Sequence, residues 1–136
     1  MRILVTGATG FIGSYFVKWL MDTDSDHTIV GFARGGDQRN YARLVDDNEN
    51  VGYVWGDLCD PGAVSGLCEG IDVVINFAAK TFVDHSLKDD GPFVASNILG
   101  ARNLMNDAMR YNVKRFVQVS TDEVYGEILH GAYSET

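Results

Sequence analysis

Short apolar runs alternate with longer stretches of helical periodicity along the chain, and this alternation predicts the fold. The runs that predict strands are residues 2–6, 27–33, 51–56, 72–79 and 114–120. Such runs are typical of strands buried on both faces of a parallel sheet. Helical spacing occupies residues 10–21, 60–69 and 89 or 92 to 111. Because right-handed crossovers return each strand to the same direction, the pattern predicts one α/β domain over residues 1–136. It would hold a doubly wound, Rossmann-like parallel sheet of order 3-2-1-4-5.

The apolar faces of these helices predict which side chains pack on the sheet. In the first helix the predicted inward residues are Ile12, Phe16, Trp19 and Leu20. In the longest helix the predicted buried stripe is Val94, Ile98, Ala101, Leu104, Met105 and Ala108. The short helix between them is predicted to start with Asp60 as its N-cap and Pro61 in its first turn, and to end just before Gly70.

Composition and charge narrow the classes of partner. The 136 residues are 46% hydrophobic and include only 2 prolines, which is typical of a folded globular domain. The formal net charge of -8 disfavours nucleic acid, because phosphates bind clustered Lys and Arg. The N-terminal apolar run is too short for a signal peptide, and no stretch approaches the roughly 20 residues of a membrane-spanning helix. We therefore expect a cytoplasmic protein that binds neither nucleic acid nor membrane.

The spacing of cysteine and histidine gives no sign of a metal site. Cys59 and Cys68 form no C-x-x-C pair, so both are predicted to be reduced, buried thiols. The histidines, His27, His85 and His130, are scattered and lack the spacing of zinc ligands. No metal is expected.

The stretch GATGFIG, residues 7–13, follows the first predicted strand and opens the first helix. In this context Gly7 allows a tight turn, Gly10 lets the main chain approach a pyrophosphate, and Gly13 lets helix and strand pack closely. The helix N-terminus, at Phe11 and Ile12, supplies amide donors for an anion. The pattern predicts a dinucleotide site, and the alternative is a tight turn that binds nothing.

The end of the second predicted strand bears on which dinucleotide binds. A carboxylate there usually meets the ribose of NAD, whereas an arginine meets the 2′-phosphate of NADP. Ala33 occupies the expected acidic position, Arg34 follows it, and Arg39 is in the same loop. Since arginine bonds phosphate well, this stretch favours NADP over NAD. There are two alternatives. Arg34 faces solvent or stacks on the adenine, or Asp37 forms a hydrogen bond to the ribose.

Four stretches together resemble the extended short-chain dehydrogenase/reductase family: GATGFIG, GDL (56–58), NFAAKTFVDHS (76–86) and STDEVYG (120–126). The resemblance covers almost the whole chain. It is strongest to the nucleotide-sugar 4,6-dehydratases, in particular those acting on dTDP-glucose, because Thr121, Asp122 and Glu123 match their Thr-Asp-Glu set. The related 4-epimerases share this frame without the acid pair, and decarboxylases and GDP-mannose dehydratases tend toward Thr-Ser-Glu.

The resemblance implies transient oxidation at C4 of a nucleotide sugar, loss of water across C5 and C6, and a 4-keto-6-deoxy product. Elimination needs a base for the C5 proton and an acid for the leaving hydroxyl, and therefore two carboxyl groups. By resemblance Asp122 is the acid, Glu123 is the base, and Thr121 bonds the sugar near O4. Neighbouring carboxyls favour one protonated and one ionised group. The alternative is a solvated acidic loop.

Further site residues are implied by the resemblance alone. Asp57 and Leu58 match adenine contacts, Thr81 matches a substrate contact, and the other matched cofactor contacts are Ala78, Ala79, Lys80 and Ser96. Asn97 matches a residue that shapes the site, although an asparagine packing within a helix is the alternative. Lys80 and Phe82 stand where the dTDP-glucose enzymes usually have Glu and His, which leaves the nucleotide and the sugar open.

One expected partner of this chemistry, a Tyr-x-x-x-Lys pair, does not occur in the 136 residues. By resemblance we expect it beyond Thr136, together with the last strands and the sugar-binding portion. We therefore expect this chain alone to be inactive and the complete protein to be a homodimer, with residues 89–111 as a candidate contact. A 4-epimerase or decarboxylase, and a noncatalytic NAD(P)-binding module, are the alternative functions.

Overall fold

The computed structural model describes residues 1–23, 26–35 and 49–135. Their centre is a five-stranded sheet of order β3-β2-β1-β4-β5, and every neighbouring pair of strands is parallel. The strands are β1 Arg2–Thr6, β2 Thr28–Ala33, β3 Val51–Trp55, β4 Val73–Asn76 and β5 Arg115–Gln118. The predicted fold class and strand order are confirmed.

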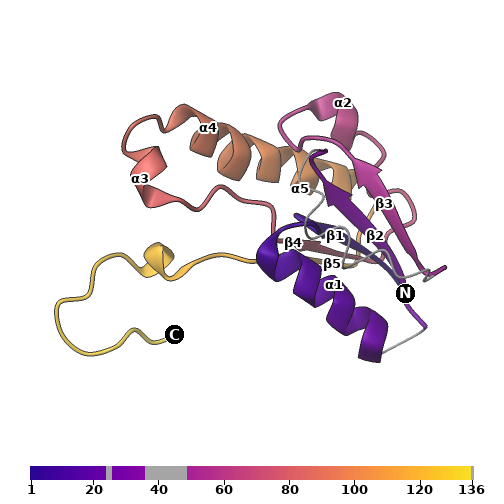
Figure 1. Ribbon diagram of the computed structural model, residues 1–136, viewed down its shortest axis with the longest axis horizontal. Helices are drawn as coiled ribbons and strands as arrows, with labels where there is room; N and C mark the ends of the chain where they lie inside the picture. Colours follow the sequence, from indigo (N-terminus) through magenta and orange to yellow (C-terminus); the bar gives the residue numbers. More distant parts are fainter. Residues whose placement is uncertain (24–25, 36–48, 136) are drawn as a thin grey trace.

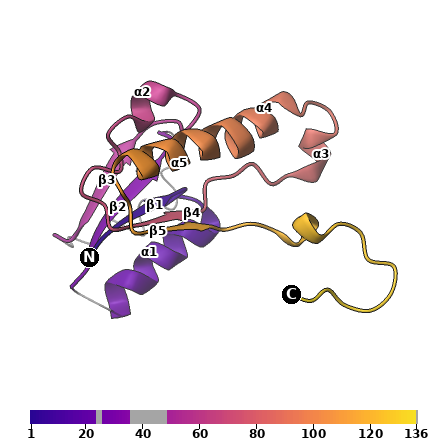
Figure 2. The same ribbon diagram turned by 180° about the vertical axis from the view of Figure 1, so that it is seen from behind.

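Helices cover both faces of this sheet. They are α1 Phe11–Thr23, α2 Pro61–Val64, α3 Val83–Ser86, α4 Gly91–Val94 and α5 Ala101–Arg110, with a π-helical turn η2 Ala95–Gly100 and a 3-10 turn η3 Asp122–Tyr125. Figures 1 and 2 show α1 on one face, with α2 and α5 on the other. α4, η2 and α5 follow one another without a break as a single rod, here called the α4–α5 rod.

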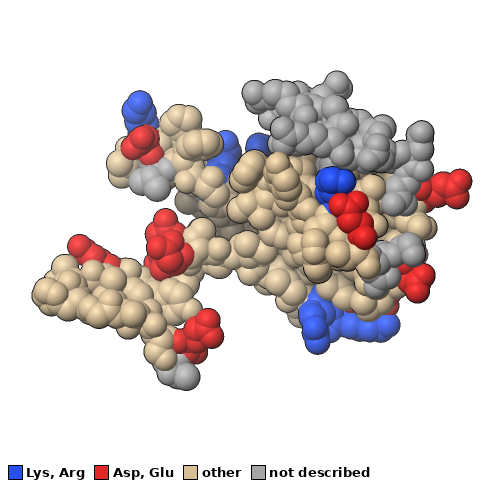
Figure 3. Space-filling view, turned by 60° about the horizontal axis from the view of Figure 1, so that its bottom comes forward, with Lys and Arg blue, Asp and Glu red and all other residues tan. Residues whose placement is uncertain are grey.

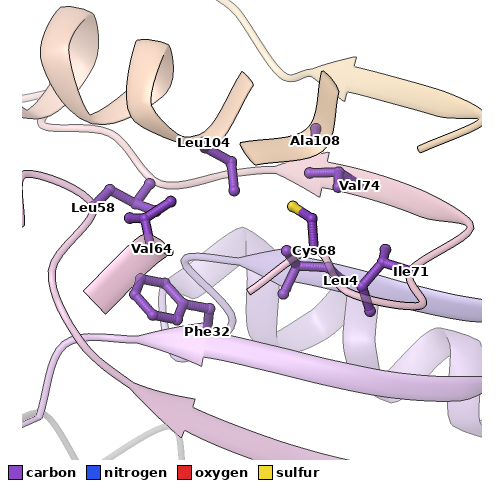
Figure 4. Packing of buried hydrophobic residues seen from close by; sticks show 9 residues of the cluster. All are labelled: Leu4, Phe32, Leu58, Val64, Cys68, Ile71, Val74, Leu104 and Ala108. Carbon is purple, nitrogen blue, oxygen red and sulfur yellow. The ribbon is translucent and has the colours of Figure 1, made fainter. Parts of the chain in front are cut away.

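Two hydrophobic clusters hold the layers together, one on each face of the sheet. The cluster under α5 and α2 is drawn in Figure 4 and contains Leu4, Phe32, Leu58, Val64, Cys68, Ile71, Val74, Leu104 and Ala108. The cluster under α1 contains Ile3, Val5, Ala8, Val17, Leu20 and Ile29. Burial of each large aliphatic or aromatic side chain contributes about 1.5–3 kcal/mol. The sheet is therefore a two-sided support for the loops at its strand ends.

The predicted inward face of α1 is wrong at two positions. Ile12 is 62% exposed and Trp19 is 56% exposed, whereas Val17 and Leu20 are buried. The reason lies at the start of the helix, where a side chain on Gly13 would collide with the carbonyl of Gly7. The glycine must therefore face the strand, and it turns the Val17 side of the helix inward.

The predicted buried stripe of the longest helix is wrong at three of its six positions. Ala101, Leu104 and Ala108 are buried, but Val94, Ile98 and Met105 are exposed. The π-helical turn at Ala95–Gly100 closes its bonds over a wider ring than an α-helix does. This turn shifts the face of Val94 and Ile98 relative to α5, so one regular stripe cannot run through the rod. Met105 lies within α5, and the turn does not explain its exposure.

The boundaries of α2, β4 and β5 also differ from the prediction. α2 has the predicted N-cap, since Gly62 N donates to Asp60 Oδ1 at 2.8 Å, but it ends at Val64 rather than near Gly70. Gly66 and Gly70 both have positive φ, which turns the chain after this single helical turn. Strands β4 and β5 are shorter than predicted and stop at Asn76 and Gln118.

After β5 the chain leaves the sheet as an exposed arm, residues 119–135 (Figures 1 and 2). The arm carries the 3-10 turn η3. On the face shown in Figure 3, Lys and Arg side chains occur in small separate groups among Asp and Glu. Among the described residues, no helix is long and apolar enough to cross a membrane.

Candidate functional site

The candidate site lies at the carboxyl ends of the strands, beside the point where the strand order reverses. β1 pairs with β2 on one side and with β4 on the other. In a doubly wound sheet this arrangement opens a crevice outside the strand ends, because successive crossovers leave toward opposite faces. The loop from β1 into α1 lies at this crevice, and its shape depends on glycine.

Glycine is required at two positions of this loop. Gly7 has φ +65°, and a Cβ there would lie 2.8 Å from the main-chain nitrogen of Ala78 in the loop after β4. Gly13 packs against the carbonyl of Gly7, as described above. Only glycine adopts this backbone and this spacing without strain. The loop is thereby held against both β4 and the first turn of α1.

The N-terminus of α1 opens on the same crevice. The first helical bond runs from Ser14 N to Gly10 O at 2.9 Å, so the amides of Phe11, Ile12 and Gly13 belong to the first turn, where no intrahelical acceptor exists. Such a terminus suits an anionic group. Phe11, Ile12 and Gly13, which the sequence predicted as cofactor contacts, are not among the residues that line the cavity described next.

A cavity of about 420 Å³ lies between this loop and the ends of β2, β3 and β4, and we call it the glycine-loop cavity. The residues predicted as cofactor contacts that line it are Gly7, Gly10, Arg34, Asp57, Leu58, Ala78, Ala79 and Ser96. The lining residues that the sequence did not single out as contacts are Thr9, Phe32, Ala33, Gly35, Gly56 and Phe77. Three of these six, Ala33, Gly56 and Phe77, directly follow or end a strand, and that position could have identified them.

The carboxylate of Asp57 is a fixed negative group in this cavity. Its Oδ1 accepts a hydrogen bond from Cys59 N at 2.9 Å. That bond, together with the positive charges of Arg34 and Lys80, holds the pKa of Asp57 below its ordinary value. Asp57 is therefore ionised at neutral pH and acts as a hydrogen-bond acceptor.

A second cavity of about 400 Å³ adjoins the first, because Ala78 and Ala79 line both. We call it the acid-loop cavity. The predicted site residues that line it are Lys80, Thr81, Asn97, Thr121 and Glu123. It is completed by Ser86, Phe93, Ala101, Met105, Gln118, Val119 and Ser120, which the sequence did not indicate. Asp122 is not among the lining residues.

The Thr-Asp-Glu stretch forms the start of η3. Thr121 is its N-cap residue. The hydroxyl of Thr121 donates to Glu123, and this bond holds the pKa of Glu123 below its ordinary value. Glu123 is therefore ionised at neutral pH, which suits a proton acceptor. The two neighbouring carboxyl groups have different surroundings, because Glu123 lines the cavity and Asp122 does not.

Two sets of hydrogen bonds fix the strand ends beneath these cavities. Asn97 is bonded to both main-chain groups of Lys80, accepting from its N at 2.8 Å and donating to its O at 2.9 Å. Asn76, fully buried, accepts from the hydroxyl of Thr6 and donates to Gln118 Oε1 at 2.7 Å. The loop after β4 is thus joined to the α4–α5 rod, and the ends of β1, β4 and β5 are joined to one another.

The remaining candidates add no site. Cys68 is buried, and burial raises the pKa of its thiol to about 12, but Cys59 is only partly buried, so the prediction of two buried thiols is wrong for it. Among the described residues, no three His, Cys, Asp or Glu side chains come together as a metal site. Asp37 and Arg39 lie outside the described residues.

Comparison with known proteins decides the family. A sequence model of the NAD dependent epimerase/dehydratase family matches residues 3–136. The chain belongs to this family. It is 45% identical to a dTDP-glucose 4,6-dehydratase of Actinoplanes sp., over 99% of the chain and 44% of that relative.

Solved structures of the epimerase/dehydratase family have the same fold. A dTDP-glucose 4,6-dehydratase of Streptomyces venezuelae, solved with NAD bound, is 37% identical with a TM-score of 0.90, over 100% of the chain and 44% of that protein. A UDP-N-acetylglucosamine 4-epimerase of Methanobrevibacter ruminantium is 27% identical with a TM-score of 0.85, over 99% of the chain and 42% of that protein. The chain thus spans less than half the length of these relatives.

Proposed function

We propose that the complete protein is a nucleotide-sugar 4,6-dehydratase and that residues 1–136 form its dinucleotide-binding domain. The observation that carries this proposal is the pair of adjoining cavities. One contains the glycine loop and the other contains Thr121 and Glu123, and they share Ala78 and Ala79. A dinucleotide in the first would bring its reactive end to the wall of the second, where a sugar would lie.

The glycine-loop cavity fits a dinucleotide by its shape and its donors. The loop has no side chain at Gly7 or Gly10, and its main chain leads directly into the N-terminus of a 13-residue helix. A pyrophosphate needs both features. Asp57 would accept from the adenine, and Ala78, Ala79, Lys80 and Ser96 would lie along the rest of the cofactor.

NAD is the dinucleotide that we propose. It is present in the structure from Streptomyces venezuelae, and a dTDP-glucose 4,6-dehydratase of Bacillus anthracis, 31% identical, was also solved with NAD. Arg34 lines the cavity and is the feature that favours NADP. Competitive titration of the chain and its Arg34→Ala variant separates the two: NADP as the preferred ligand, lost in the variant, would contradict this choice.

The side chains of the acid-loop cavity can carry the elimination. A nicotinamide held beside Ala78 and Ala79 would supply reversible hydride transfer to and from the sugar, and the C4 hydroxyl proton would go to a base of the complete protein. Glu123, held ionised by Thr121, would take the C5 proton, which is acidic once C4 is a ketone. Asp122 would protonate the leaving C6 hydroxyl, and Thr121 would orient the sugar near O4. Because Asp122 does not line the cavity, its role requires the η3 turn to rotate toward the sugar.

The acid pair favours a dehydratase over a 4-epimerase, although an epimerase is among the structures with the same fold. A 4-epimerase moves a hydride at C4 and has no water to expel, so it needs no second carboxyl group. A noncatalytic binding module would use neither acid.

We also propose that the complete protein is a homodimer joined through the α4–α5 rod, whose exposed residues include Val94, Ile98 and Met109.

The test uses the complete protein, dTDP-glucose and the variants Asp122→Asn and Glu123→Gln. Each should lower formation of the 4-keto-6-deoxy product by about 10²–10⁴-fold, the usual contribution of a general acid or base, without changing NAD affinity. Glu127→Gln, on the same exposed arm, is the matched control and should keep full activity. Full activity of the Glu123→Gln variant, or an epimerised sugar as the product, would overturn the dehydratase proposal.

A further inference from the structure

The α4–α5 rod is bonded through its side chains to the main chain of three separate loops. Asn97 holds Lys80, as described above. Asn103 Nδ2 donates to the carbonyl of Leu58 at 2.9 Å. Asp107, buried, accepts from Gly66 N at 3.0 Å and from Cys68 N at 2.8 Å. Asn103 and Asp107 both lie in α5, four residues apart, which is the spacing of one helix face.

Asn103 acts on the loop after β3, which forms one wall of the glycine-loop cavity. Gly56, Asp57 and Leu58 all line that cavity. The rod approaches this loop so closely that a Cβ on Gly100 would lie 3.0 Å from Leu58 Cβ. The side chain of Leu58 is 5% exposed and packs in the cluster under α5. The Asn103 bond therefore fixes the carbonyl of a residue whose side chain is already held.

Fixing Leu58 also fixes Asp57, the residue before it. The Asp57 carboxylate is oriented at one oxygen by Cys59 N, and the main chain next to it is held by Asn103. The position of the Asp57 carboxylate in the glycine-loop cavity thus depends on the bond from Cys59 N and on the bond from Asn103 to Leu58. An ionised carboxylate accepts hydrogen bonds and cannot donate. It can bond the 6-amino group of adenine, but it repels the 6-oxo group of hypoxanthine.

We infer that Asn103 is a positioning residue for base selectivity: its bond to the Leu58 carbonyl sets the Asp57 carboxylate where it distinguishes adenine from hypoxanthine. This inference rests on the proposed binding of NAD. Asn103 is partly exposed and does not line the glycine-loop cavity. Its effect on the ligand would pass through the loop.

The experiment is calorimetric titration of the 136-residue chain with NAD and with nicotinamide hypoxanthine dinucleotide, which differs from NAD at the 6-position of the base. The variants are Asn103→Ala, which removes the side chain, and Asn103→Asp, which keeps its size but removes the donor. Asp107→Asn is the matched control, because it weakens bonds that the Asp107 side chain accepts from main-chain N–H groups about one helical turn away, at a loop outside the cavity. Thermal unfolding shows that each variant is folded at the titration temperature.

In the unmodified chain NAD should bind more tightly than the hypoxanthine analogue. Both Asn103 variants should weaken NAD binding about five-fold, the effect of one lost hydrogen bond, and should bring the two dissociation constants closer together. Asp107→Asn should lower thermal stability and leave the ratio of the constants unchanged. If the unmodified chain binds NAD and the Asn103 variants keep its affinity and ratio, or the control changes the ratio equally, the inference is wrong. If the unmodified chain does not bind NAD, the proposed function fails and the inference fails with it.

Discussion

The loops after β1 and β5 both leave carboxyl ends of parallel strands, yet they are built differently. In the first, Thr6, Ala8 and Thr9 are buried, and the chain continues into a 13-residue helix. In the second, every residue from 119 to 135 is exposed, and the regular structure is a single 3-10 turn. Packing determines the conformation of the first loop. The second loop is exposed, so its side chains are placed for contact with a ligand rather than for packing.

The two cavities therefore differ in what holds their shape and in the effect that substitutions should have. The glycine-loop cavity is shaped by close main-chain approaches that one added methyl group would disrupt. The acid-loop cavity depends on a few hydrogen bonds, such as the two between Asn97 and the main chain of Lys80. Substitutions in the first region should therefore alter folding and cofactor binding together, whereas those in the second should alter chemistry alone.

The largest expected effect concerns Cys68, in the hydrophobic cluster that also contains Phe32 and Leu58 of the glycine-loop cavity. Burial raises the pKa of this thiol from 9.0 to about 12, and the thiolate is the reactive form. In a Cys59→Ser variant, alkylation of Cys68 at pH 8 should be about 10³-fold slower than that of a free cysteine. The rate should become normal in urea. Rapid alkylation of Cys68 in the folded chain would show that the reagent reaches this core.

Gly7→Ala should be the next largest effect. The new side chain would have φ +65° and a Cβ 2.8 Å from Ala78 N. Left-handed backbone and overpacking together cost about 3 kcal/mol, measured by urea unfolding, and NAD binding should be lost. Gly52→Ala is the control, because nothing lies within 4 Å of a Cβ there. Equal stability of the two variants would contradict packing as the determinant of this loop.

The pH dependence of Asp57 should give a moderate effect. Its pKa in the folded chain is below the ordinary value of 3.8, so its contribution to stability is complete above that value and is lost as the pH falls through the folded-state pKa. The difference in unfolding free energy between the unmodified chain and Asp57→Asn should be constant from pH 7 to 5 and should shrink below about pH 4. If this difference in unfolding free energy instead grew on acidification, the interactions of Asp57 with Cys59 and Arg34 would not be its cause.

The smallest effect should come from the exposed arm. The double variant Asp122→Asn and Glu123→Gln in the 136-residue chain should change the unfolding free energy by less than about 0.5 kcal/mol, as is usual for surface sites. Its NAD affinity should match that of the unmodified chain. A large loss of stability or of NAD affinity would show that the two regions are not separate in this way.

The sequence was sufficient to predict the fold class, the strand order and the N-cap at Asp60, because each is a local or repetitive pattern. It was misleading for Trp19 and Ile98. Helix rotation at Trp19 depends on how Gly13 meets Gly7, and at Ile98 on a π-helical turn, and neither is a periodic signal. Similarly, the lining of the acid-loop cavity by Ser86, Phe93 and Gln118 becomes visible only when separate elements meet in space.

The central claim is that the packed loop after β1 forms a dinucleotide site within these 136 residues. The most direct measurement is titration of the chain with NAD, beside the Gly7→Ala variant, after circular dichroism has shown that both are folded. The account predicts saturable binding of a single NAD by the unmodified chain and none by the variant. A folded chain that shows no saturable binding, or a variant that binds equally well, would contradict it.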